Sequence, residues 1–155
     1  PNNSNFISGV LYEFTTTKDQ SGSFGVGQDN YFGNRIYRSG YSYEGEIIGF
    51  PFILNDPTLE LDESTIAIIS NRVAVHHFGL AGQYKSVLWL LKSSIAKSFG
   101  RFINPFPEPV TTTHHFLEST YPTESFGSFT LILGLDTSSV IETNFGGGLK
   151  YSYAF

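Results

Sequence analysis

Apolar and polar residues alternate along the last segment of the chain, from Asn144 to Phe155. One parity is apolar or aromatic apart from Gly147, whereas the other parity is small or polar and includes Lys150. This period of two predicts a β-strand with one apolar face. In a soluble sandwich such a face packs on a second sheet, and in a membrane barrel it faces lipid.

The same alternation recurs upstream. It is clear at 6–15 and 128–136, where Phe6, Val10, Phe129 and Leu133 belong to the apolar sets. Helix is the rival interpretation for 86–98, because Leu, Lys and Ala are helix formers. Six strands are predicted, at 6–15, 72–83, 86–98, 116–121, 128–136 and 144–155. Further candidates lie at 41–46 and 66–70.

Short and long connections alternate between these strands. The connections at 83–85 and 122–125 are short, whereas 18–70, the Pro-rich stretch 99–115 and 137–143 are longer. Bacterial outer-membrane barrels have short periplasmic turns and longer outer loops. We therefore expect an all-β fold, an antiparallel transmembrane β-barrel in which residues 1–155 form a single segment with a long extracellular loop at about 18–70.

The number of strands bears on how much of a barrel is present. Six to eight strands fall at or below the usual minimum of about eight for a membrane barrel. The chain begins at Pro1 and contains no Met. These observations lead us to expect the C-terminal portion of a larger barrel.

Composition narrows the possible functions. Charged residues are only 15% of the chain, against roughly 25% in typical soluble domains, and aromatic residues are 16%. The net charge is −5 and the nine Lys and Arg residues are scattered, which argues against nucleic-acid binding. There is no Cys, which excludes disulfide scaffolds and Cys-ligated zinc modules.

Candidate catalytic motifs are few. No G-x-S-x-G sequence is present, and the glycines from Gly22 to Gly27 do not follow the dinucleotide-binding spacing. Glu13 and Glu118 could share a face, but carboxylate catalysis needs a defined separation. We expect a protein that is not an enzyme and that needs no cofactor.

Two pairs of adjacent histidines, 76–77 and 114–115, are candidate metal ligands. Neighbouring side chains on a strand point to opposite faces, so neither pair can readily share one metal ion. We expect no metal site here.

The motifs YEFT (12–15), QSG (20–22), DNYF (29–32), IYRSG (36–40), NRV (71–73) and HHFGL (76–80) together resemble the Wzi-type capsule assembly proteins. The resemblance implies a large barrel of about eighteen strands in the outer membrane of a Gram-negative bacterium. It also implies a non-catalytic, lectin-like role in anchoring or assembling capsular or other surface polysaccharide. The departure is length, because chains of that family are several times longer.

The segment from Asp29 to Glu46 concentrates aromatic residues and arginines. Flat rings can stack on sugars, and Arg can pair with the carboxylates of acidic glycans. The alternatives are that these aromatics fold back into the barrel mouth or contact a partner protein. The candidate glycan-binding residues are Tyr31, Phe32, Arg35, Tyr37, Arg38, Tyr41 and Tyr43.

The aromatic end of the chain is a candidate barrel-assembly signal. It consists of Tyr151, Tyr153 and Phe155, and it resembles the terminal strand that the assembly machinery binds. The expected partners are surface polysaccharide, outer-membrane lipid, that machinery, and the rest of the barrel or other outer-membrane proteins. Alternative functions are a structural subunit of an outer-membrane complex, a passive pore, a soluble β-sandwich or an outer-membrane hydrolase.

Overall fold

The structure is a computed structural model that describes residues 6–19, 32–33, 36–56, 58–60, 66–123, 125–140 and 142–153. These residues form strands and connections, with no helix among them. The expected all-β, antiparallel class is confirmed at this level.

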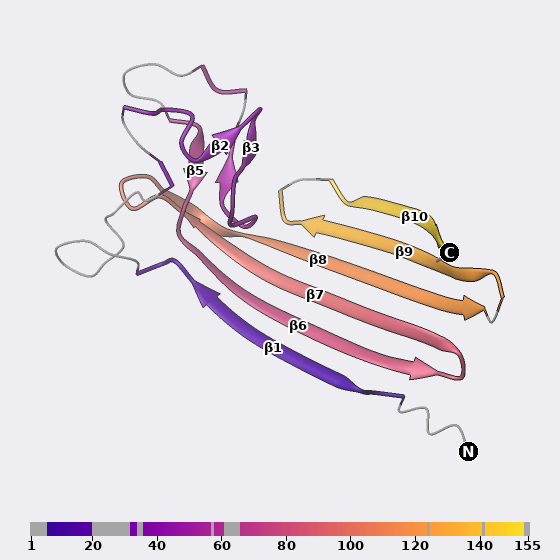
Figure 1. The fold of residues 1–155 in the computed structure, drawn as a ribbon. Coiled ribbons are helices and arrows are strands. Elements are labelled where there is room, and N and C mark those ends of the chain that lie inside the picture. The colour runs from indigo at the N-terminus through magenta and orange to yellow at the C-terminus, as the bar shows by residue number, and fades with distance from the viewer. Residues whose placement is uncertain are drawn as a thin grey trace. The chain divides into compact units, whose positions relative to one another are not determined.

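Six strands form one sheet in the order β1-β6-β7-β8-β9-β10 (Figure 1). Their bounds are Gly9–Thr16 for β1, Val73–Tyr84 for β6, Val87–Gly100 for β7, Pro105–Thr123 for β8, Gly127–Ser138 for β9 and Asn144–Ser152 for β10. All neighbours in this order except β1 and β6 are also consecutive in sequence, since β2 to β5 lie between those two. β1 and β10 are the two edges of the sheet.

Four short strands lie between β1 and β6. They are β2 (Ser42–Tyr43), β3 (Glu46–Ile47), β4 (Leu54–Asn55) and β5 (Ile68–Ser70). β2 pairs with β3 and β4 pairs with β5, each pair forming its own two-stranded sheet. The β2–β3 turn places Glu44 and Gly45 at φ 50° and 86°, the left-handed geometry of a tight hairpin.

The chain divides into two compact units, which we describe separately. The sheet unit comprises Pro1–Glu13, His76–Ile95 and Thr112–Phe155, and the loop unit comprises Phe14–Val75 and Ala96–Thr111. All the buried apolar side chains of the described residues belong to the loop unit. Val73, Val75 and Ala96 form its core cluster, and Phe50 and Phe52 pack against them.

The sheet unit has two unlike faces. In the ladder of β8, β9 and β10, Tyr121 lies opposite Phe129 and Phe129 opposite Tyr151, whereas Thr120 lies opposite Thr130 and Thr130 opposite Lys150. Side chains alternate across a strand. One face is therefore apolar and the other polar.

The strand predicted at 86–98 is confirmed over the helix alternative, because β7 covers 87–98. One prediction about the connections needs correction. The predicted long connection at 99–115 is wrong, because β8 begins at Pro105 and leaves only residues 101–104 between β7 and β8. The prolines of this stretch are tolerated because the β8–β9 ladder ends at the Thr112–Ser138 pair. Pro105–Thr111 therefore does not pair with β9, and proline, which has no N–H to donate, is accepted at such an unpaired edge.

The candidate strands at 41–46 and 66–70 do not add to the six-stranded sheet. The first is the β2–β3 hairpin and the second contains β5, so both belong to the small sheets. The main sheet thus has six strands within the described residues.

Candidate functional site

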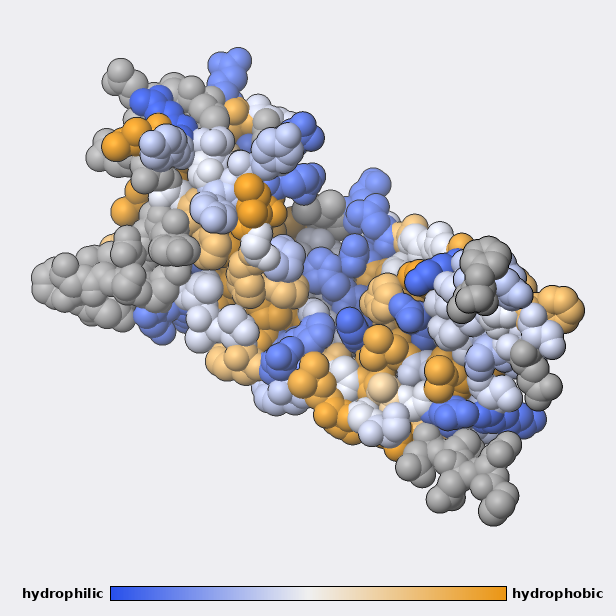
Figure 2. All heavy atoms as spheres, in the orientation of Figure 1, coloured by the Kyte–Doolittle hydropathy of each residue, from blue (hydrophilic) through white to orange (hydrophobic). Residues whose placement is uncertain are grey.

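The apolar face of the sheet unit is exposed over all six strands. Its side chains include Leu149, Val10 and Phe145, which are 86%, 73% and 71% exposed. Apolar residues reach the surface as orange patches in Figure 2. An exposed apolar area of this extent marks an interaction surface. Its large exposed members are Phe6, Val10, Tyr12, Phe78, Tyr84, Leu91, Ile95, Tyr121, Phe129, Leu131, Leu135, Phe145, Leu149, Tyr151 and Tyr153.

Contacts between strands fix which side chains share this face. Tyr12 packs on Phe78, a Cβ on Gly82 would lie 2.5 Å from Trp89, and Ser93 bonds His115. The opposite face is linked in the same way, since Leu11 lies over Gly79 and His77 bonds Ser94.

Charge is confined to the polar face. The Asp, Glu, Lys and Arg residues of the described strand segments in the sheet unit all have the parity of that face. They are Glu13, Lys92, Glu118, Asp136 and Lys150. Lys92 holds its Nζ 5.8 Å from the centre of the Phe116 ring, which is also on the polar face.

Aromatic side chains gather on the apolar face beside the short turns at 85–86 and 124–126. Phe6 contacts Trp89 and Tyr84 at centroid distances of 5.5 Å and 6.4 Å, and Phe129 contacts Tyr151 at 5.1 Å. Tyr121 lies opposite Phe129. One end of the apolar face is thus bordered by rings from five strands and from the segment preceding β1.

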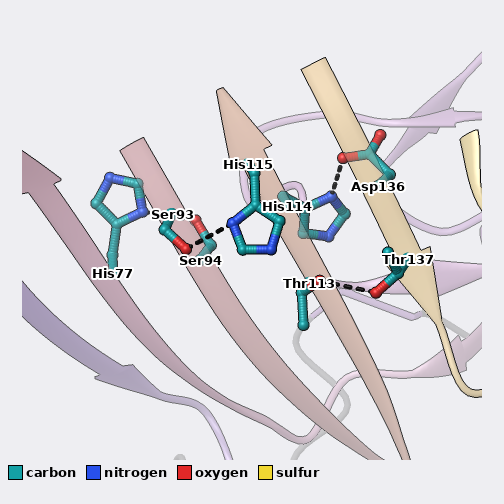
Figure 3. Close-up of polar contacts among 8 residues, drawn as sticks. All are labelled: His77, Ser93, Ser94, Thr113, His114, His115, Asp136 and Thr137. Atoms are coloured by element: carbon teal, nitrogen blue, oxygen red, sulfur yellow. Dashed lines mark hydrogen bonds and ion pairs between the residues drawn. The ribbon is translucent and has the colours of Figure 1, made fainter. Parts of the chain in front are cut away.

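Hydrogen-bonded polar pairs border the other end of the apolar face. The Tyr12 hydroxyl lies 2.9 Å from Nδ1 of His76, and Thr113 bonds Thr137 at 2.8 Å. The Ser93–His115 bond, also 2.8 Å, joins β7 to β8 and so lies between the β1–β6 pair and the β8–β9 pair in the strand order. Figure 3 shows this bond and the Thr113–Thr137 bond. Each of these side chains therefore has a hydrogen-bonding partner within the sheet.

The polar face carries its own pairs at the same level. His77 bonds Ser94 at 2.6 Å, and His114 bonds Asp136 at 2.8 Å (Figure 3). The prediction that adjacent histidines point to opposite faces is confirmed, because His76 and His115 bond partners on the apolar face. No group of three or more possible metal ligands exists among the described residues.

In the loop unit, three of the five described glycan-binding candidates are exposed. Tyr37, Tyr43 and Tyr41 are 72%, 68% and 59% exposed, while Phe32 and Arg38 are half-buried. Tyr31 and Arg35 lie outside the described residues, as does Phe155 of the predicted assembly signal. Tyr151 and Tyr153 of that signal are exposed.

A tight turn fixes the backbone of these residues. The Gly40 N–H donates to the Tyr37 carbonyl, and the Tyr41 N–H donates to the Phe32 carbonyl, each at 2.9 Å. Gly40 has a φ of 67°, and a Cβ there would lie 2.6 Å from both the Phe32 carbonyl oxygen and Cγ1 of Ile68. Only glycine fits this close approach.

Asp56 closes another turn of the loop unit. Its carboxylate accepts hydrogen bonds from the Thr58 hydroxyl at 2.6 Å and the Thr58 N–H at 2.9 Å. These bonds, the hydroxyl first, lower the pKa of Asp56 below its ordinary value.

Comparisons with protein-family models, with curated proteins and with solved structures find no match to the chain. No helix long and apolar enough to cross a membrane is found among the residues that the structure describes. A functional assignment therefore depends on the chemistry of the surfaces described above.

The polar pairs on the apolar face escaped sequence reasoning. Ser93 is the one polar residue at the odd-numbered positions between Val87 and Ile95. A polar residue within an apolar set is the signal that could have identified it as one member of a hydrogen-bonded pair. Its bonding partner His115 lies in a stretch predicted to be a connection, so the pair could not be identified.

Proposed function

We propose that this chain is a segment of an outer-membrane β-barrel in a Gram-negative bacterium, with a non-catalytic role in holding or assembling surface polysaccharide. One observation supports the membrane part most strongly: within the strand segments of the sheet unit, the exposed face that carries Phe145 and Leu149 has no charged residue, while the charged residues of those segments lie on the opposite face. A charged side chain near the bilayer midplane costs about 2–4 kcal/mol in a barrel. A polar, water-filled interior accepts it.

The height of the apolar face approaches that of a membrane band. Along β9, Phe129 belongs to the aromatic border and Thr137 to the polar border. Eight steps of about 3.4 Å give about 27 Å along the strand, or about 19 Å after a tilt of about 45°. The apolar band of outer-membrane barrels is about 25 Å tall and is flanked by aromatic girdles, so this face is about 6 Å shorter than a typical band.

The two edge strands support a larger barrel. Exposed edges offer unpaired N–H and C=O groups, and no such groups are tolerated in lipid. We expect β1 and β10 to pair with further strands of the same barrel.

The polysaccharide role draws on the loop unit and on the resemblance to Wzi-type proteins. Tyr37, Tyr41 and Tyr43 present exposed rings within one short segment, and Arg38 supplies a cation beside them. Tyrosine rings stack on sugar faces, and Arg pairs with carboxylates. Weak contacts of this kind add through effective concentration when a polymer engages several copies of the site.

A matched pair of arginine substitutions tests the membrane assignment. Leu133 and Ile132 are adjacent, half-buried residues of β9 on the apolar and the polar face. We expect Leu133→Arg to reduce the folded, heat-modifiable protein in outer-membrane fractions severalfold, and Ile132→Arg to be tolerated. Equal tolerance of both, with protein recovered in the absence of detergent, would contradict the proposal and favour a soluble sandwich.

Polysaccharide retention tests the second part of the proposal. In cells that carry Arg35→Ala with Arg38→Ala, or Tyr37→Ala with Tyr43→Ala, we expect total polysaccharide to be unchanged and more of it to be shed into the medium. Barrel abundance in the outer membrane is the control and is expected to stay the same. Unchanged cell-bound polysaccharide in both variants would remove the glycan role and redirect attention to protein partners.

A further inference from the structure

Two cations and two phenyl rings form one cluster in the loop unit. The Lys18 Nζ lies 4.6 Å from the centre of the Phe99 ring, and the Arg72 guanidinium carbon lies 6.0 Å from the centre of the Phe102 ring. Nε of Arg72 donates to the Lys18 carbonyl at 3.2 Å, and the Phe99 N–H donates to the Arg72 carbonyl at 2.8 Å. The two hydrogen bonds join Lys18, Arg72 and Phe99, and the ring contact with Arg72 adds Phe102.

The residues of the cluster are only partly covered. Phe99 follows the buried Ser98 in β7, and adjacent residues alternate across a strand, so Phe99 points to the opposite side from Ser98. Arg72 lies in the connection between β5 and β6, next to the buried Val73. Arg72, Phe99 and Lys18 are all half-buried.

Both cations lack an acidic partner within the described part of the chain. Their contacts are aromatic rings and the Lys18 carbonyl, and none is an ion pair with a described carboxylate. Two positive charges held in one patch repel each other, and this repulsion is relieved when an anion binds between them. Arg and Lys are the usual partners of phosphate oxygens.

Exposed apolar side chains adjoin the cations. Phe102 is 38% exposed and Ile103, the next residue of the β7–β8 turn, is 80% exposed. A soluble phosphate would gain nothing from these side chains, whereas an amphipathic molecule with a phosphate at its polar end would contact both parts.

We propose that Lys18, Arg72, Phe99 and Phe102 bind the phosphorylated headgroup of an outer-leaflet glycolipid. The cations pair with the phosphate, and the phenyl rings with Ile103 contact the adjoining sugar and hydrocarbon. This inference rests on the proposed outer-membrane location.

The test measures binding of lipid A by the purified full chain in detergent. The probes are diphosphorylated lipid A, its dephosphorylated form and inorganic phosphate, and the variant is Lys18→Gln with Arg72→Gln. We expect the variant to bind diphosphorylated lipid A about tenfold more weakly, as loss of charge-assisted hydrogen bonds predicts. Dephosphorylated lipid A is expected to bind both proteins equally weakly.

Lys85→Gln is the matched control. The Lys85 Nζ lies 5.5 Å from the centre of the Tyr84 ring, so it is also a cation over an aromatic ring, but it belongs to the β6–β7 turn of the sheet unit. We expect less than about a twofold change for this variant. A charge-conserving variant, Lys18→Arg with Arg72→Lys, is expected to retain binding and guards against loss through misfolding.

Other results would overturn the proposal. Equal binding by the wild type and the Gln variant, or equal losses for the Gln variant and Lys85→Gln, would remove the site. Inorganic phosphate that competes at concentrations comparable to the lipid would make it a site for free phosphate. Cell fractionation tests the outer-membrane proposal separately. Recovery of the protein in the soluble fraction would contradict that proposal, whatever its affinity for lipid A.

Discussion

Ser93 and His115 join neighbouring strands β7 and β8 through a 2.8 Å hydrogen bond on the apolar face of the sheet unit. Leu91 of β7 and Leu117 of β8, which lie next to this pair along the same face, are both apolar. A polar atom in such surroundings costs free energy unless it has a partner. The two residues are therefore coupled, and each makes the other tolerable.

Removing one member should cost more than removing both. We expect Ser93→Ala to lower the free energy of unfolding by about 1–3 kcal/mol, because Nδ1 of His115 loses its partner. The double variant Ser93→Ala with His115→Leu should recover most of this loss. Urea unfolding in lipid vesicles measures the cycle, and additive losses in the double variant would show that the two residues are not coupled.

Gly127 should be irreplaceable, whereas Gly148 should not. Gly127 has a φ of 83°, and a Cβ there would lie 2.2 Å from the Ser152 carbonyl oxygen. We expect Gly127→Ala to cost about 1–3 kcal/mol and to loosen the end of β10. Nothing lies within 4 Å of a Cβ on Gly148, so Gly148→Ala should be neutral or stabilise by up to about 1 kcal/mol. Equal unfolding midpoints for the two variants would contradict this.

The Asp56 turn should weaken at low pH. The folded pKa of Asp56 is lowered by the Thr58 hydrogen bonds, so the turn is favoured above the ordinary pKa of about 3.8 and loses this support as the pH falls through the lowered value. We expect Thr58→Val to return the Asp56 pKa toward the ordinary value, since it removes the hydroxyl donor. An NMR titration of the Asp56 carboxyl measures this. The same pKa in both proteins would refute the assigned cause.

Gly40→Ala should disturb the candidate glycan surface without touching a ring. Its Cβ would clash with the Phe32 carbonyl and Ile68, and its positive φ disfavours alanine. We expect polysaccharide retention to fall about as far as in the tyrosine variants, while Ser39→Ala, an exposed substitution in the same turn, leaves retention unchanged. Full retention in Gly40→Ala would separate this turn from glycan binding.

The alternation of apolar residues was sufficient to predict most of the large sheet. β9 and β10 were predicted nearly to their ends because every second residue, such as Leu131 and Leu133, is apolar over eight or more positions. In β7, tertiary pairing overrides the helix-forming tendency of Leu, Lys and Ala. The same alternation also predicts on which face of the sheet each side chain of a strand lies.

The start of β8 could not be predicted, because proline normally excludes a strand. Pro105, Pro107 and Pro109 alternate with residues that can donate, so their missing N–H groups all lie on one side of the strand. That tolerance depends on where β9 ends, which is not a local property of the sequence. The Lys18–Arg72 cluster was missed for a related reason: its residues are far apart in the chain, and β1 with β6 brings them together.

β1 pairs with β6, although residues 17–72 separate the two strands in the sequence. This pairing has a consequence for how the chain folds. The strands from β6 to β10 form a meander whose connections are only a few residues long, so each pairing closes a small loop. Pairing β1 with β6 closes a much larger one, and its entropic cost must be met before the contacts form. We therefore expect the meander to assemble first and β1 to add late, so that truncating the inserted segment would speed this final step more than it would change the finished sheet.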